Sequence, residues 1–312
     1  MHSRSSVLSG IDQRRLERIR FDLDMLIARV IKDKFDAGRR SKKFDDEYVK
    51  VFSRYLVSQA RHRSDLARGV QNADSAKSYD PFSIISLNWD ILLDNALDRA
   101  LEEADAEVGF NDYDPFGVVD YCCYVSSLDK GDRRIRTGLW SLGAKGYNVK
   151  LLKIHGSMNW LQCTNCQQLF TKFGEKLITG RSWNCRHCKE HEIEAPLRGS
   201  LIMPTFLKDF SNFQLKLVWQ NAAVELMEAT RLVFVGYSLP ESDFEFRQLL
   251  SRMVHPKAKI EAVLWKNEDN SLPYELEQER YRQFFAGHKV SFESKGVEKF
   301  VKKEVSDSRM KK

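Results

Sequence analysis

The chain has 312 residues, of which 42% are hydrophobic and 11% aromatic, and its net charge is +6 from 50 basic and 44 acidic residues. This composition is typical of a folded protein with one large or two modest domains, and it excludes global disorder. The charge is too small and too mixed in sign to predict nucleic-acid binding, although an anionic small ligand would suit it. No apolar run has membrane-spanning length and no signal peptide is recognisable, so we expect a cytoplasmic protein without a membrane anchor.

The first eighty residues are expected to form helices. Ser9 and Asp12 are typical of a helix start, and apolar residues then recur at helical spacing. They are Leu16, Ile19, Leu23, Leu26, Val30 and Ile31. A second periodic set begins at Tyr48 and predicts a helix that continues to Leu66. We therefore assign residues 1–80 to an N-terminal helical region.

From residue 81 to residue 270, short apolar runs alternate with helical patterns. Such alternation predicts an α/β fold, a Rossmann-like and mostly parallel sheet covered by helices. The strands are expected at 82–87, 149–154, 197–203, 231–235 and 259–265, with one more strand in the run VVDYCCYVSS. The helices are expected after residue 90, at 210–229 and at 243–253. We expect residues 271–312 to add one apolar helix, a short VSF run and a lysine-rich tail that frays.

Two Cys-x-x-Cys knuckles interrupt this α/β pattern. Cys163 and Cys166 form the first, and Cys185 and Cys188 form the second after eighteen intervening residues. This spacing is typical of a four-thiolate zinc site, and paired knuckles in a chain without a secretion signal favour metal over disulfide. Four protein ligands leave no open coordination position, so the zinc is expected to be structural. We assign residues 161–190 to a small zinc-ribbon or helical subdomain.

Other candidate ligands and two further cysteines lie outside these knuckles. His187 and His191 could compete for the metal, but Cys188 completes a cleaner knuckle. Cys122 and Cys123 lie in an apolar run, so we interpret them as small buried side chains in a strand.

Polar residues follow two of the predicted strands at their carboxyl ends. Asn88 and Asp90 follow the run 82–87, and His155 with Gly156 follows the run 149–154. In open α/β sheets, ligands bind at the carboxyl ends of the strands. Asn88 could equally cap the next helix with Asp90 in its first turn, and spacing alone does not separate these two roles.

Taken together, several short motifs resemble the sirtuin family and particularly its divergent prokaryotic sirtuin-like branch. The motifs are SLNWD, KIHGSMNW, the four-cysteine insert, MPTFLK, LVFVGYSLPESDFEFRQLL and LWKN. They follow the family's order from Ile84 to Asn267. SLNWD is similar to the sirtuin Gln-Asn-x-Asp element, with Leu87 in place of the glutamine.

The resemblance implies an activity on NAD, because the family cleaves the bond between nicotinamide and ribose. It implies that Asn88 orders the water or a ribose hydroxyl, that Asp90 contacts the nicotinamide carboxamide, and that His155 is the general base. A packed, non-catalytic His155 is the competing interpretation. The implied function is an NAD glycohydrolase, which in this branch commonly serves phage defence.

The remaining family positions concern the rest of the dinucleotide. The resemblance implies that Gly236 and Ser238 approach the ribose-phosphate side of NAD, where a glycine permits close backbone approach, and that Asn267 lies near the adenosine. The implied partners are NAD itself and a second copy of the chain or a defence-system protein, with no direct binding of nucleic acid or membrane.

One family element is missing from the sequence. Sirtuins begin with a strand and a Gly-Ala-Gly-x-Ser loop that receives the pyrophosphate at a helix N-terminus. None of the sixteen glycines here lies two residues from another, and no apolar strand precedes the first helix. We therefore expect the first strand of the family fold to be missing, through truncation or degeneration. A non-catalytic binding module and an NAD-dependent protein deacylase remain as alternative functions.

Overall fold

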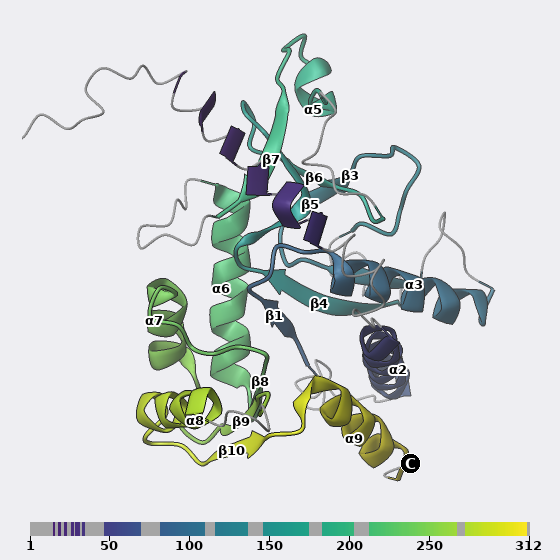
Figure 1. The fold of residues 1–312 in the computed structure, drawn as a ribbon. Coiled ribbons are helices and arrows are strands. Elements are labelled where there is room, and N and C mark those ends of the chain that lie inside the picture. Colours follow the sequence, from purple (N-terminus) through teal and green to yellow (C-terminus); the bar gives the residue numbers. More distant parts are fainter. Residues whose placement is uncertain are drawn as a thin grey trace, which may run out of the picture.

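The computed structural model describes residues 47–69, 82–109, 116–136, 146–174, 183–202, 212–266 and 272–310, with single helical positions between residues 15 and 34. The fold is α/β, as the alternating pattern predicted (Figure 1). The strands are β1 (Ile84–Ser86), β2 (Gly117–Asp120), β3 (Val125–Ser127), β4 (Tyr147–Lys153), β5 (Gly156–Cys163), β6 (Leu169–Thr171), β7 (Leu197–Leu201), β8 (Arg231–Val235), β9 (Lys259–Val263) and β10 (Val290–Glu293). The helices are α2 (Glu47–Gly69), α3 (Leu92–Ala106), α5 (Arg186–Lys189), α6 (Phe213–Glu228), α7 (Phe244–Met253), α8 (Leu272–Phe284) and α9 (Gly296–Met310).

Two three-stranded parallel sheets form the larger part of the fold. The first has the order β1-β4-β2 and the second the order β10-β9-β8. In the first sheet, Ile84 pairs with Leu151 and Ser86 with Lys153. Strand β4 is central and is mostly buried, as expected of a parallel strand that helices cover on both faces. Within the described residues, β1 and β8 each pair with a neighbour on one side only.

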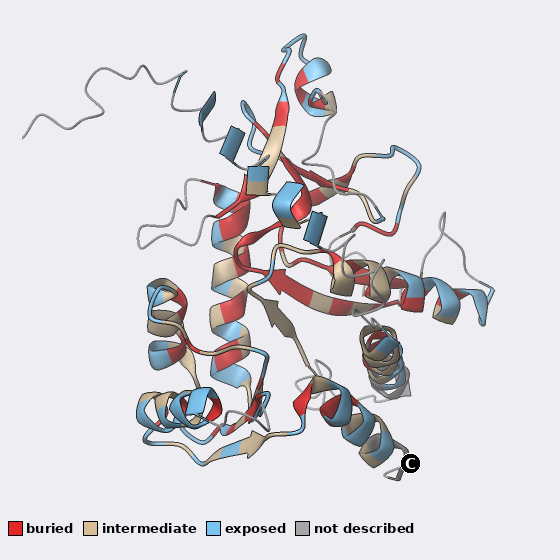
Figure 2. Ribbon diagram, viewed as in Figure 1, coloured by how far each residue is buried: buried red, intermediate tan, exposed pale blue. Residues whose placement is uncertain are grey.

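Helices cover both faces of β4. On one face Lys153 contacts Asp94 of α3, and α3 packs against α2. On the other face Lys150 contacts Glu225 of α6. Helix α2 also packs against α9, which contacts β9, so this helical layer extends over the second sheet. Most of β4 and all of β2 are accordingly buried, whereas β1 is half-buried (Figure 2).

Strands β4 and β8 run in the same direction. Helix α6 is antiparallel to β4, because Trp219 lies beside Ile154 whereas Glu225, further along α6, lies beside Lys150. Strand β8 begins next to the end of α6 and ends at Val235, and the ring of Tyr237, two residues later, contacts Phe246 at the start of α7. Phe246 in turn contacts Trp219, so β8 runs back along α6. The carboxyl ends of β4 and β8 therefore lie at the same end of α6, the end that carries Trp219.

A third sheet forms a separate lobe beyond the end of β4. Its order is β3-β6-β5-β7, with β5 antiparallel to β6 and to β7 and with β3 parallel to β6. Strand β5 follows β4 directly through the turn at Ile154 and His155, and Gly156 is its first residue. The lobe extends away from the parallel sheets in Figure 1 and carries α5.

The expectation of one strand through VVDYCCYVSS is wrong. The run forms β2 and β3, which belong to different sheets. The chain breaks at Cys122, whose φ of 55° is left-handed, and the Asp120 carboxylate accepts a hydrogen bond from the Cys122 amide at 2.8 Å. Cys123 is buried and Cys122 is half-buried, but both lie in this turn rather than in a strand.

The expectation that the lysine-rich end frays is also wrong, because this segment forms α9. Its residues Phe300 and Val301 are 3% and 1% exposed and pack with Val263 of β9. Val297, Phe300, Val301 and Val305 recur at helical spacing between the lysines, which gives α9 an apolar face. In the described part of the chain, no helix combines the length and apolarity that crossing a membrane requires.

Candidate functional site

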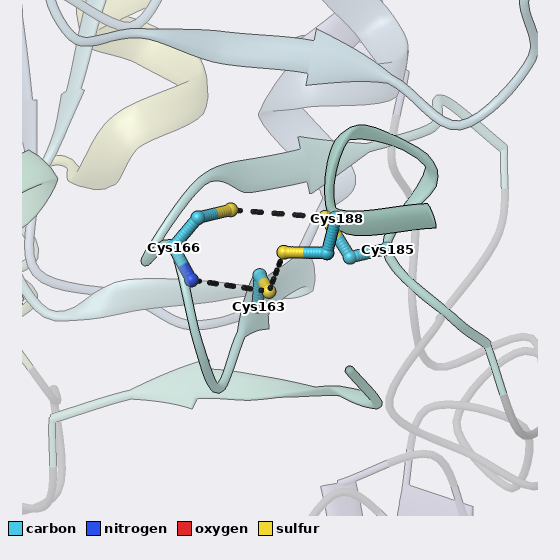
Figure 3. Close-up of side chains that lie close together, drawn as sticks. All are labelled: Cys163, Cys166, Cys185 and Cys188. Carbon is cyan, nitrogen blue, oxygen red and sulfur yellow. Dashed lines mark hydrogen bonds between the residues drawn. The ribbon is translucent and has the colours of Figure 1, made fainter. Parts of the chain in front are cut away.

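Four cysteine side chains converge in the small lobe, as the knuckle spacing predicted (Figure 3). Their Sγ atoms all lie within 4.8 Å of one another. The Sγ atoms of Cys163 and Cys188 are 3.6 Å apart, and those of Cys166 and Cys185 are 3.7 Å apart. Four sulfurs around a tetrahedral zinc lie about 3.8 Å from one another, so the cluster has the size of a zinc site.

Backbone turns hold each knuckle in place. The amides of Asn165 and Cys166 both donate to the Sγ atom of Cys163, each at 3.4 Å. The next residue, Gln167, has a left-handed φ of 60° and returns the chain towards β6. In the second knuckle, the Cys188 carbonyl accepts hydrogen bonds from the amides of His191 and Ile193, each at 3.0 Å.

The thiols of the cluster are held in different environments. Burial raises the pKa of the Cys185 thiol to about 12. The Asn165 side-chain amide, which donates to the Cys188 Sγ atom at 3.5 Å, lowers the pKa of that thiol to about 7. A divalent cation would offset the cost of burying several thiolates together, and metal binding would release their protons.

The histidines near the knuckles do not belong to the cluster. His187 stacks on Phe170 with 5.6 Å between the ring centroids, and the set of converging ligands contains the four cysteines alone within the described residues. The prediction that Cys188 rather than a histidine completes the second knuckle is thus confirmed. Cys163, Cys185 and Cys188 are also part of the lobe's small hydrophobic cluster, so a metal there would join β5 to the α5 segment.

Polar residues from two strand ends come together outside this lobe. Asn88 and His155 each follow by two residues the register pair Ser86 and Lys153. The Ile154 amide closes this last pair by donating to the Ser86 carbonyl at 3.2 Å. Asn88 and His155 therefore both follow the carboxyl ends of one pair of parallel strands.

The two residues differ in exposure and in packing. Asn88 is exposed, whereas His155 is 5% exposed and its ring lies 6.3 Å from the indole of Trp219. Gly156 follows with φ of +77°, and a Cβ atom there would lie 2.1 Å from the Ser200 carbonyl oxygen. Only glycine allows this close approach of β7, which fixes the turn that carries His155.

Asp90 serves the start of α3. Its Oδ1 atom accepts a hydrogen bond from the Leu92 amide at 3.0 Å, so a carboxylate satisfies one of the free donors of the first turn. Helix α3 begins at Leu92, which places Asn88 outside the capping position. The capping alternative, with Asn88 as the cap and Asp90 in the first turn, is therefore wrong: Asp90 precedes the helix, and its carboxylate rather than the Asn88 amide binds the first helical amide.

The loop after β8 supplies the next predicted residues. Gly236 is exposed and has φ of +64°, and a Cβ atom added there would meet no other atom within 4 Å. Ser238 is half-buried, and its carbonyl oxygen accepts a hydrogen bond from Arg280 of α8. The Tyr281 hydroxyl donates to the Tyr237 carbonyl at 2.6 Å, so α8 holds this loop at two points. Asn267 lies outside the described residues.

A row of aromatic rings connects the two carboxyl-end loops. His155 lies 6.3 Å from Trp219, Trp219 lies 6.5 Å from Phe246, and Phe246 lies 5.8 Å from Tyr237, measured between ring centroids. Trp219 also donates its Nε1 hydrogen to the Ile154 carbonyl at 2.8 Å. Packing on α6 and α7 therefore fixes the position of His155 relative to the loop that carries Gly236.

Sequence reasoning missed a buried polar cluster under the same edge. The Lys153 ammonium lies 3.1 Å from the Asp94 carboxylate, which accepts a hydrogen bond from the Tyr121 hydroxyl at 2.8 Å. The side chains of Lys153 and Asp94 are 2% and 0% exposed, and Tyr121 is 0% exposed. The signal that could have revealed it is a lysine within the otherwise apolar run LLKI.

A pocket of ≈ 320 Å³ lies on the zinc lobe, lined by residues that include Ser126, Asp129 and Arg186. It is therefore not at the carboxyl edge, and its lining mixes acids with bases, which gives it no clear ligand.

Comparison with known proteins adds no identity. No protein-family model and no curated protein matches this chain.

Proposed function

We propose that this chain is a sirtuin-like protein that hydrolyses the bond between nicotinamide and ribose in NAD. The observation that supports it most is that Asn88 and His155 follow the carboxyl ends of the paired strands β1 and β4. This is the edge at which open α/β sheets bind ligands. The motif order described above supplies the choice of NAD over other ligands.

In the proposed reaction, nicotinamide leaves as positive charge builds on the ribose ring, and a water molecule adds to the same carbon. The exposed Asn88 amide would orient that water or a ribose hydroxyl. His155 would accept the proton that the water loses, because an imidazole titrates near neutral pH. Asp90 would contact the nicotinamide carboxamide through the carboxylate oxygen that does not bind the Leu92 amide.

The loop after β8 would take the ribose-phosphate part of NAD. Gly236 presents its backbone without a side chain, and Ser238 offers a hydroxyl donor at the same edge. We propose that the metal in the cysteine cluster is zinc and that it is structural, because its four ligands leave no position for substrate. A role in phage defence through NAD depletion, in the cytoplasm, is part of the same proposal.

Nicotinamide release by the purified chain tests this function. We expect release from NAD, measured by chromatography, and its loss in His155→Ala and Asn88→Ala. His62→Ala is the matched control, because His62 is exposed on α2 and its loss should leave the rate unchanged. Wild-type release no faster than the uncatalysed background, at high protein concentration, would refute the proposal.

A non-catalytic NAD-binding module is the second candidate. The burial of His155 against Trp219 and the capping bond of Asp90 favour it, because both give these residues a structural role. An NAD-dependent rise of the thermal midpoint without nicotinamide release would support this candidate, since a ligand that binds only the folded state stabilises it. No rise and no release would exclude both candidates.

A further inference from the structure

We infer that Lys153 is a positioning residue that fixes the loop carrying Asn88 at the carboxyl edge of β1 and β4, acting through Asp94 and Tyr121. The inference deepens the proposed function, on which its catalytic consequence rests. The positioning itself is a property of the fold and can be measured without any turnover.

The cluster joins segments from three strand ends. Lys153 is the last residue of β4, Asp94 lies in the first turn of α3 after β1, and Tyr121 follows β2 directly. The Lys153 ammonium donates to the Asp94 Oδ2 atom at 3.1 Å, and the Tyr121 hydroxyl donates to Oδ1 at 2.8 Å. Tyr121 is held in turn by the edge of Trp160, with ring centroids 5.2 Å apart.

Lys153 also binds the loop itself. Its ammonium donates to the Asp90 carbonyl at 2.5 Å. Before Asn88, the Ser86 carbonyl accepts a hydrogen bond from the Ile154 amide, and after it the Trp89 carbonyl accepts one from the Met158 amide at 2.9 Å. The loop is thus attached to β4 and β5 on both sides of Asn88, and Lys153 supplies the one side-chain attachment among these three bonds.

Burying the Lys153 and Asp94 charges costs free energy, so their presence needs a reason other than stability. The side chains of Lys153 and Asp94 are 2% and 0% exposed, and each ion loses its hydration there. Apolar side chains of similar volume often stabilise a core as well as a buried ion pair does. An apolar residue at 153 could not bind the Asp90 carbonyl, so what the ammonium adds is the placement of the loop.

The same strand provides a matched control. Lys150 forms an ion pair with Glu225 at 2.8 Å, and both side chains are less than one-fifth exposed. This pair lies on the opposite face of β4 and binds α6 rather than the loop before α3. Removing it tests the loss of a partly buried ion pair without touching the loop.

Two variants separate positioning from folding. Lys153→Met alone would leave the Asp94 carboxylate buried and unpaired, and the protein could fail to fold. Lys153→Met/Asp94→Leu/Tyr121→Phe removes both charges and the hydroxyl together, so neither charge is left buried without the other. Lys150→Met/Glu225→Leu is its control, and thermal unfolding establishes that both variants are folded.

Amide hydrogen exchange is the first readout. In the triple variant we expect exchange in residues 87–92 to rise about tenfold or more, because the loop loses its side-chain attachment. Exchange in α6 should be unchanged in the triple variant, and the Lys150 control should match the wild type in residues 87–92. Wild-type exchange in residues 87–92 of a folded triple variant would overturn the inference, whatever the activity.

Nicotinamide release is the second readout. We expect kcat of the triple variant to fall about 100-fold with KM nearly unchanged, the effect of a displacement of about 1 Å at a reacting centre. An unchanged kcat in the folded triple variant would also overturn the inference. If the wild-type chain releases no nicotinamide, the proposed function fails by itself, and hydrogen exchange alone decides the role of Lys153.

Discussion

Asn88 and His155 each follow by two positions the paired residues Ser86 and Lys153, so both leave the same pair of strands at its carboxyl edge. The parallel register brings the two chains to this edge without any contact between the two side chains. A parallel strand pair is therefore enough to join two polar residues that lie far apart in sequence. The turn at Gly156 then decides how the imidazole is presented.

Gly156→Ala should disrupt this turn much more than Gly236→Ala disrupts the loop after β8. Both glycines have positive φ, +77° and +64°, so both substitutions impose left-handed strain of about 1–2 kcal/mol. Only at Gly156 would the new Cβ meet a backbone atom, the Ser200 carbonyl oxygen at 2.1 Å. We expect a loss of about 3 kcal/mol or more for Gly156→Ala and about 1 kcal/mol for Gly236→Ala, measured by denaturant unfolding.

Equal losses at the two glycines would contradict this prediction, because the difference between them is the contact with Ser200. The Gly236 variant has a second use. If NAD approaches that backbone closely, Gly236→Ala should weaken NAD binding although it costs only about 1 kcal/mol of stability.

Metal loss should unfold the small lobe. Purified protein is expected to hold about one zinc ion per chain, and Cys163→Ser or Cys188→Ser should abolish it. Because a metal held by these cysteines would join β5 to α5, we expect the midpoint of thermal unfolding to fall by about 10 °C or more. Cys122→Ser is the matched control, since Cys122 lies outside the cluster. Metal content by mass spectrometry checks the first claim, and a cysteine variant with full zinc content would refute the assignment.

The sequence predicts the elements whose patterns are local. The segment Arg231–Val235 forms a strand with the predicted limits. The two Cys-x-x-Cys knuckles meet as expected. Each of these predictions depends on periodicity or on spacing within a short segment. A tetrahedral ion imposes its geometry wherever the chain can turn, which is why the cysteine spacing is so informative.

The missed features depend on contacts between distant residues or on a single backbone angle. Lys153 and Asp94 are separated by 59 positions, and only the fold shows that a lysine in an apolar strand has a buried partner. The break at Cys122 depends on a left-handed φ that a non-glycine residue rarely adopts, so composition predicted a continuous strand. Asp90 was an ambiguous residue for the same reason, since a cap and a ligand-binding carboxylate have the same local sequence.

Buried tyrosines should make the protein sensitive to alkali. Burial raises the pKa of Tyr281 and of Tyr121 well above the ordinary value, so the folded state keeps these protons after the unfolded state has lost them. Their stabilising contribution is complete below about pH 10, the unfolded pKa, and is lost as pH rises towards the folded pKa. Each tyrosine should lower the free energy of unfolding by about 1.4 kcal/mol per pH unit above pH 10.

Between about pH 10 and pH 11, the free energy of unfolding should therefore fall less steeply with pH in Tyr281→Phe than in the wild type. The difference in slope is the contribution of one tyrosine. Denaturant unfolding at several pH values measures the slope. Tyr124→Phe is the control, because Tyr124 is 61% exposed and its removal should leave the slope as it is. An identical slope in Tyr281→Phe and the wild type would show that the Tyr281 phenol ionises in the folded protein.

The last helix should contribute to global stability although its sequence is rich in lysine. Phe300 is 3% exposed and packs with Val263 of β9 and near Val51 of α2. Phe300→Ala would leave a cavity between the sheet and two helices, which typically costs about 3–5 kcal/mol. Lys302→Ala, on the exposed side of the same helix, should change stability by less than about 0.5 kcal/mol. A single unfolding transition that shifts for Phe300→Ala alone would establish α9 as part of the cooperative core. A frayed tail would instead give two variants that unfold like the wild type, because neither side chain would then have packing to lose.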